Sequence, residues 1–264
     1  MFKLDANQIL IDAHVHLHDA SRAMSDLRKA FDNFSSLPIP ANSTVIMLAE
    51  RQGFDVFSGL RKQLRHTAEP ESLWFERNNH EMLVLAGRQI ISSEGLEILG
   101  LATKVNIADG LPAETVIDQL QEQDALVVLP WGVGKWLGRR GKIVDAIIAK
   151  NVRGLSASNT DRTLFLGDNA GRPAFWPVAQ FSSGLCVLPG SDPLPLQDSA
   201  EAIGRFGALV HAQLSIQTPA SDLKQVLRNP LTAPQPFGKL SPAFHFVRDQ
   251  ARLRLAHPTE MAAA

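Results

Sequence analysis

Near its N-terminus the chain reads Ile11-Asp12-Ala13-His14-Val15-His16, and a short apolar run, Ile9 to Ile11, opens this segment. We interpret the segment as the end of the first strand of a β/α barrel. Residues two apart in a strand project to the same side, about 7 Å apart at their Cα atoms. His14 and His16 therefore point together and can reach one metal ion.

A carboxylate for the same site follows a late apolar run. Leu185 to Leu188 predicts a strand, and Pro189-Gly190-Ser191-Asp192-Pro193 comes directly after it. Asp192 would then lie at the same barrel mouth as the two histidines. Each motif also has a purely structural interpretation. The segment around Asp192 is typical of an ordinary turn, and an H-x-H pair is often one buried and one exposed histidine.

Apolar runs alternate with amphipathic helical stretches along most of the chain. Runs at 9–11, 44–48, 125–129, 152–155 and 185–188 predict strands, and stretches at 21–34, 54–64, 112–120 and 142–150 predict helices. Residues 82–102 predict a hairpin broken at 92–95. We expect an α/β fold, a distorted seven-stranded TIM-like β/α barrel, with a doubly wound open sheet as the alternative. Residues 1–256 form a single domain in this interpretation, and 257–264 form a frayed tail.

The composition is that of a globular protein that works on small molecules. Of 264 residues, 45% are hydrophobic and 20% are charged, and the formal net charge is -1. The basic residues are scattered, so we expect no nucleic-acid footprint and no anionic-membrane footprint. A single cysteine, Cys186, excludes an internal disulfide and a thiolate zinc cluster. The N-terminal apolar run is too short for a signal or a membrane span, and we expect a cytoplasmic protein.

Two polar segments that follow apolar runs could bind an anion. The first, after residues 125–129, is rich in glycine and basic residues, and the second lies in a long polar loop before residue 173. Exposed backbone N–H groups and basic side chains suit phosphate or carboxylate, although each segment also suits a solvated loop. The candidate substrate-binding residues are Lys135, Arg139, Arg140, Asn169 and Arg172.

In combination, these motifs resemble the polymerase and histidinol phosphatase (PHP) family over most of residues 9–195. The family's opening H-x-H is matched by His14 and His16, and its closing Gly-Ser-Asp-x-His is matched in part at Gly190 to Asp192. Gly87-Arg88-Gln89-Ile90 resembles the family's Gly-x-Glu-Ile strand. The resemblance implies a distorted seven-stranded barrel and a hydrolase that uses about three metal ions.

Several of the family's metal ligands are replaced in this chain. The Asp-His after the second strand becomes Glu50-Arg51, and the glutamate of Gly-x-Glu becomes Gln89, although Glu94 or Glu97 could serve in another register. The mid-barrel Ala-His-Pro becomes 129–131, Leu-Pro-Trp, and the last histidine becomes Leu194. The remaining donors are His14, His16, Asp192 and Glu50. They suit one divalent ion, zinc, manganese or iron, and not a full cluster.

Three functions follow from this ligand set. The first is a metal-dependent hydrolase, a phosphoesterase on a small anionic substrate, in which Glu50 is a ligand or a base. The second is a non-catalytic PHP-like barrel that binds a small ligand. The third, an amidohydrolase, is disfavoured because no histidine lies between His80 and His211 to supply the further metal ligands that such enzymes need.

Overall fold

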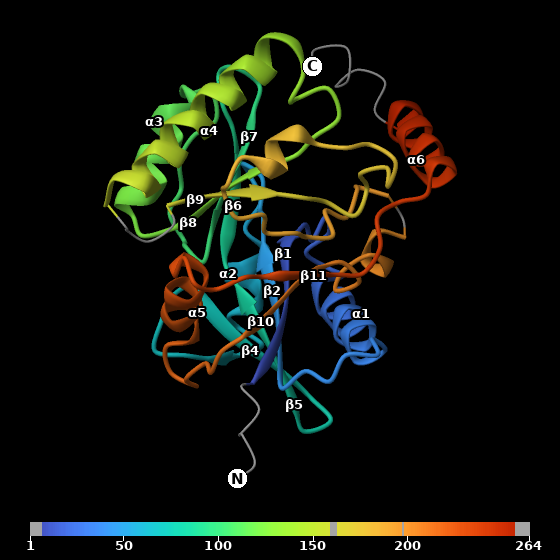
Figure 1. The fold of residues 1–264 in the computed structure, drawn as a ribbon. Coiled ribbons are helices and arrows are strands. Elements are labelled where there is room, and N and C mark those ends of the chain that lie inside the picture. The colour runs from blue at the N-terminus through green and yellow to red at the C-terminus, as the bar shows by residue number, and fades with distance from the viewer. Residues whose placement is uncertain (1–6, 159–162, 197, 257–264) are drawn as a thin grey trace.

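The computed structural model describes residues 7–158, 163–196 and 198–256. Within these residues the strands form two sheets (Figure 1). The larger sheet has the order β11 (Gln235–Phe237), β10 (Gly207–His211), β1 (Gln8–Val15), β2 (Ser43–Leu48), β5 (His80–Leu85), β4 (Ser72–Arg77), β3 (Arg65–His66). The smaller sheet has the order β6 (Gly87–Ile91), β7 (Glu97–Leu101), β8 (Leu126–Pro130), β9 (Leu164–Gly167).

Six α-helices accompany the two sheets within the described residues. They are α1 (Ala23–Ser35), α2 (Val56–Leu60), α3 (Ala113–Glu122), α4 (Gly138–Ser158), α5 (Pro219–Arg228) and α6 (Ala243–Ala256). Figure 1 shows α3 and α4 together over β7 to β9, and α1 beside the larger sheet. The α/β class predicted from the sequence is therefore confirmed.

The predicted closed barrel is not what the strands form. The seven-stranded sheet is open, and it is mixed: β1 runs parallel to β2, but β4 runs antiparallel to β5 and β10 antiparallel to β1. A short turn explains the antiparallel pairing of β4 with β5, because antiparallel neighbours need only a hairpin, whereas β10 pairs with β1 from far along the chain. Asn78 and Asn79, with φ of 51° and 60°, make the turn between β4 and β5.

The two sheets meet at isolated bridges. Glu50 beyond β2 pairs with Arg88 of β6, and Leu166 of β9 pairs with Val187. The segment at 185–188, predicted as a strand, thus lies beside β9. It pairs with β9 through an isolated bridge and does not form a regular strand. The predicted hairpin at 82–102 is present as β5, β6 and β7. The sheets curve towards each other without one continuous hydrogen-bonded ladder.

One predicted strand is wrong. Residues 152–155 belong to α4, because Val144, Ile148 and Val152 recur every four residues and all pack on the same cluster. The strand of this region is β9, further along the chain. The predicted tail at 257–264 lies outside the described residues.

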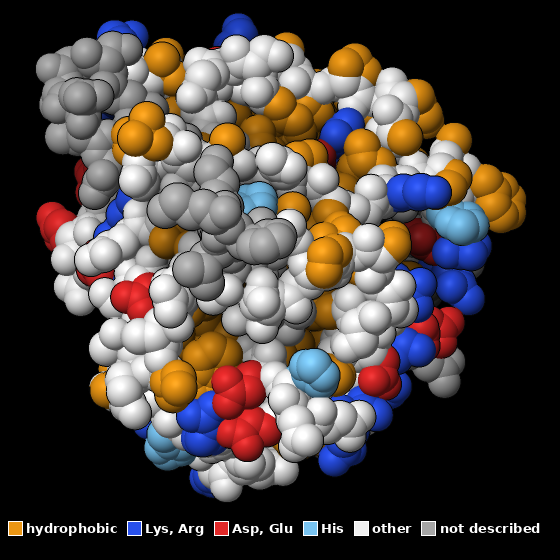
Figure 2. Space-filling model, turned by 60° about the horizontal axis from the view of Figure 1, so that its bottom comes forward, with side chains coloured by type: hydrophobic (Ala, Val, Ile, Leu, Met, Phe, Trp, Pro, Cys, Tyr) orange, Lys and Arg blue, Asp and Glu red, His pale blue; other side chains and the backbone are white. Residues whose placement is uncertain are grey.

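The surface that Figure 2 shows carries lysine and arginine side chains interspersed with aspartate and glutamate side chains. This mixture agrees with the formal net charge of -1. Among the described residues, no helix combines the length and the apolar character that crossing a membrane requires.

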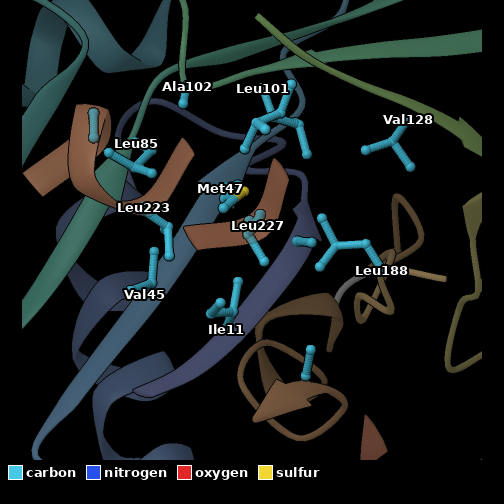
Figure 3. Packing of buried hydrophobic residues seen from close by; sticks show 14 of the residues in the cluster. Ile11, Val45, Met47, Leu85, Leu101, Ala102, Val128, Leu188, Leu223 and Leu227 are labelled. Atoms are coloured by element: carbon cyan, nitrogen blue, oxygen red, sulfur yellow. The ribbon is translucent and has the colours of Figure 1, made fainter. Parts of the chain in front are cut away.

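Helix α5 fills the space between the curved sheets. Leu223 and Leu227 point in among Ile11, Val45 and Met47, and each of these side chains is fully buried (Figure 3). The cluster also includes residues of β7 and β8 from the smaller sheet. Helix α5 therefore ties the two sheets into one core, and this core supports the strand ends that carry the polar residues described below.

The contact of α5 gives a stability prediction. We expect Leu227→Ala to lower the free energy of unfolding by about 2–5 kcal/mol, because the cavity left in a fully buried site costs more than the lost methyl groups alone. Urea unfolding followed by circular dichroism measures the change. Leu231→Ala is the matched control, because the Leu231 side chain is 89% exposed. Equal stabilities for the two variants would contradict this role of α5.

Candidate functional site

The end of β1 is crossed by a loop from far along the chain. The Ala13 N–H donates to the carbonyl of Pro189 at 3.3 Å, and the Asp192 N–H donates to the carbonyl of His14 at 2.8 Å. A Cβ atom on Gly190 would lie 2.3 Å from the backbone nitrogen of His14, so only glycine allows this approach. The loop thus brings Asp192 beside the H-x-H pair.

Asp12 anchors this loop. Its fully buried carboxylate accepts the N–H of Ser191 at 2.7 Å and the N–H of Gly204 at 2.8 Å. Burial raises the pKa of Asp12 to about 6, and the hydrogen bonds oppose that shift. Asp12 therefore holds the backbone that carries Asp192.

His14, His16 and Asp192 converge on one point. The two Nε2 atoms lie 3.0 Å apart, and each lies 3.6 Å from Oδ1 of Asp192. Two ligands at about 2.05 Å from a tetrahedral zinc ion lie roughly 3.3 Å apart, so the donor set fits one ion. Asp192 has φ of 46°, a left-handed conformation that costs energy in a residue with a side chain.

Both histidines are held in the neutral form that binds metals. Burial lowers the pKa of His14 to about 4, and burial together with the neighbouring His14 lowers the pKa of His16 to about 3. Burial raises the pKa of Asp192, while His16 opposes that change. A metal ion displaces protons from its ligands, so two neutral imidazoles accept it without a cost of deprotonation.

His16 and Asp192 line a cavity of about 260 Å³, and Nε2 of His14 lies 3.0 Å from Nε2 of His16. The walls of the cavity include Trp131, Val133 and Phe246. Its polar side chains come from β6 and β7, from segments that follow other strands and from α6: His16, His18, Arg51, Gln89, Glu97, Lys135, Asn169, Asp192, Ser241 and Asp249. Such a cavity, in which polar groups converge between apolar walls, has the form of a small-molecule site.

Two of the predicted anion-binding residues line this cavity. Asn169 donates from Nδ2 to Oδ2 of Asp192 at 3.2 Å and to the carbonyl of Trp131 at 2.9 Å, so it orients the carboxylate. Lys135 lines the cavity as well, and its ammonium group pairs with Glu97. The charge of Lys135 is therefore compensated within the protein.

The other three predicted anion-binding residues lie outside the cavity lining. Arg172 donates to both carboxylate oxygens of Asp168 at 2.7 Å, and this bidentate pair occupies its guanidinium group. Arg140 donates to the carbonyl of Gly134 at 3.4 Å, and Arg139 is exposed on α4. The structure does not bring these arginines to the histidines.

Glu50 also faces away from the cavity. Its carboxylate accepts the N–H of Phe57 at 2.8 Å and lies 3.6 Å from Nη1 of Arg88. Burial raises the pKa of Glu50, and these partners oppose the shift. Because the chain turns outward after β2 and Glu50 caps the start of α2, the structure does not place it among the metal donors.

Sequence reasoning left six polar cavity residues out of the candidate set. They are His18, Arg51, Gln89, Glu97, Ser241 and Asp249. The resemblance to the PHP family marks three of their positions, because Arg51 and Gln89 replace family ligands and Glu97 belongs to the alternative register. His18 continues the alternation of His14 and His16, and its ring stacks on that of His16 at a centroid distance of 5.5 Å.

Comparison with known proteins supports the fold. No protein-family model and no curated protein matches the sequence. The solved structure of PsfC from Pseudomonas syringae PB-5123 matches with a TM-score of 0.58 and 16% identity, over 94% of this chain and 99% of PsfC. The lesion-specific endonuclease PfuEndoQ from Pyrococcus furiosus matches with a TM-score of 0.52 and 12% identity, over 86% of this chain and 57% of PfuEndoQ. At these identities the matches show that this chain shares its fold with both neighbours.

The expectation that nucleic acid is excluded as a partner is wrong. PfuEndoQ shares this fold and is named as a lesion-specific endonuclease, so balanced charge does not keep a protein of this fold from acting on nucleic acid. Net charge describes a whole surface, whereas the residues at a cavity determine what binds there. The balanced charge of this chain therefore excludes no class of anionic partner.

The lowered pKa values of the histidine pair predict a pH-dependent stability. As the pH falls from about 6.5 towards 4, the unfolded chain takes up protons at His14 and His16 and the folded chain does not. The contribution of each histidine to the free energy of unfolding of the metal-free protein then falls on the order of 1 kcal/mol per pH unit, whereas the raised pKa of Asp12 contributes with the opposite sign between about pH 6 and 4. Urea unfolding at a series of pH values measures this slope.

The control for this slope is the double variant His14→Gln/His16→Gln. It keeps every other titrating group, Asp12 included, so as the pH falls its free energy of unfolding should decrease less than that of the original protein. The same slope in the variant and in the original protein would contradict the neutral, buried state of the pair.

Proposed function

We propose that this chain is a PHP-like hydrolase that holds one divalent metal ion at His14, His16 and Asp192 and acts on a phosphoester of a small anionic molecule. The convergence of two neutral imidazoles and one carboxylate carries the proposal. Among the described residues, the ligand atoms of His14, His16 and Asp192 all lie within 4.8 Å of one another, close enough to hold one metal ion. A bound divalent ion lowers the pKa of a water molecule and polarises a phosphoryl oxygen.

The remaining cavity residues support one ion and not a cluster. The ammonium group of Lys135 and the guanidinium group of Arg51 stand in the same cavity as the triad. Glu97 compensates the charge of Lys135, so the guanidinium group of Arg51 is the positive charge that opposes a second cation by Coulomb repulsion. It favours an anionic substrate for the same reason.

Several side chains prepare the site around the metal position. Asn169 orients the carboxylate of Asp192, and Gln89 hydrogen-bonds the side chain of His14. Partners of this kind fix the direction of a ligand's lone pair and tune its basicity. Trp131 limits the access of water from one side of the cavity.

The fold of the two neighbours is consistent with this proposal. PfuEndoQ is named as an endonuclease, which is an enzyme that cleaves phosphodiester bonds. At 12% identity the likeness carries the fold alone, so the proposed reaction rests on the triad.

Metal binding and turnover together test the proposal. We expect calorimetry with Zn²⁺ or Mn²⁺ to give one ion per chain, and p-nitrophenyl phosphate or its diester to be hydrolysed by the metal-loaded protein. His16→Gln and Asp192→Asn should each weaken metal binding and lower kcat/KM by about 100-fold or more, because each removes a direct ligand. His80→Gln is the matched control, since His80 is exposed and lies outside the cavity.

Two results would contradict the proposal. One is a protein that takes up neither ion. The other is Asp192→Asn with the turnover of the original protein while its circular dichroism spectrum is unchanged. Metal binding of the expected strength with no turnover of any phosphoester would favour the non-catalytic ligand-binding barrel instead.

A further inference from the structure

Arg51 is held in the cavity from two sides. Its Nη2 atom lies 3.1 Å from Nδ1 of His18, and its guanidinium carbon lies 5.8 Å from the ring centroid of Phe54. A guanidinium group can only donate, so Nδ1 of His18 accepts and carries no proton. Nε2 of His18 then carries the proton and donates to the carbonyl of Pro193 at 2.7 Å. His18 thus ties Arg51 to the loop that follows Asp192.

The charge of Arg51 is not compensated within the protein. In the described parts of the chain, no carboxylate forms an ion pair with it, whereas Lys135 pairs with Glu97. The other cavity carboxylates have partners of their own, because Asp192 faces the two histidines and Asp249 accepts from Arg248 at 2.9 Å. Arg51 has five N–H donors, and the contact with His18 uses one.

An uncompensated guanidinium group beside a metal triad has a clear chemical use. His16 stacks on His18, and His18 holds Arg51, so the triad and the guanidinium group are separated by one side chain. A phosphoryl group offers three oxygens, and guanidinium groups bind such oxygens in pairs. A cavity of about 260 Å³ leaves room for a small anionic group between these walls.

We propose that Arg51, positioned by His18, binds the phosphoryl oxygens of the substrate next to the His14, His16 and Asp192 triad. This inference rests on the proposed function and names the group that recognises the substrate's anion. It replaces Arg139, Arg140 and Arg172, the arginines expected from the sequence, with an arginine that lines the cavity.

Binding of inorganic phosphate to the metal-loaded protein tests the inference without turnover. We expect Arg51→Met to raise the Kd for phosphate by at least about 10-fold, the loss expected for a charge-assisted hydrogen bond, and to leave the Kd for Zn²⁺ unchanged. Arg139→Met is the matched control, because Arg139 is exposed and lies outside the cavity lining, and it should change neither constant.

The positioning role of His18 needs its own comparison. His18→Phe keeps an aromatic ring but removes the acceptor for Arg51, so we expect weaker phosphate binding with the same thermal midpoint and the same Kd for Zn²⁺. His18→Gln restores a hydrogen-bond acceptor and should recover most of the phosphate affinity. Equal phosphate binding by His18→Phe and the original protein would overturn the positioning role.

The remaining outcomes separate this inference from the proposed function. If Arg51→Met binds both Zn²⁺ and phosphate like the original protein, the inference fails and the metal site stands. The original protein could instead bind phosphate but no metal, while Arg51→Met binds neither. In that case the proposed hydrolase fails and the anion site stands. A duplex oligonucleotide that binds through Arg51 while inorganic phosphate does not would overturn the small-substrate assignment.

Discussion

The contact between the end of β1 and the loop at 188–192 is the constraint on which the site depends. The buried carboxylate of Asp12 holds two backbone N–H groups, and Gly190 lets the loop approach the backbone of His14. An unpaired carboxylate at that depth would be costly, so the loop and the strand are fixed to each other. Asp192, more than 170 residues beyond His16 in the sequence, is thereby placed 3.6 Å from it.

The site combines two neutral imidazoles and one carboxylate with the cationic side chains of Lys135 and Arg51. Lys135 is compensated by Glu97, whereas Arg51 is uncompensated and oriented by His18. In the resemblance to the PHP family, the position of Arg51 corresponds to a histidine ligand. An arginine stays protonated and cannot bind a metal ion, so the replacement exchanges a metal ligand for a positive charge. The same region can thus attract an anion with fewer metal ions.

The alternation of residues and the apolar runs in the sequence predicted the short-range features of the fold and of the site. Alternation placed His14 and His16 on one side of β1, and apolar runs located β2 and β8. An open sheet was only the alternative prediction, and its mixed strand directions could not be predicted, because the antiparallel partner of β1 is β10, from far along the chain. The direction of Glu50 and the ion pair of Arg172 with Asp168 depend on tertiary contacts that residue type does not reveal.

The most direct test of the account is a crystal structure of the protein grown with Mn²⁺ or Zn²⁺, with anomalous scattering used to locate the ion. We expect one anomalous peak bound by Nε2 of His14, Nε2 of His16 and Oδ1 of Asp192, with metal–nitrogen distances of about 2.0–2.2 Å. An ion bound elsewhere in the cavity, or a triad that stays free of metal at saturating concentration, would contradict the account.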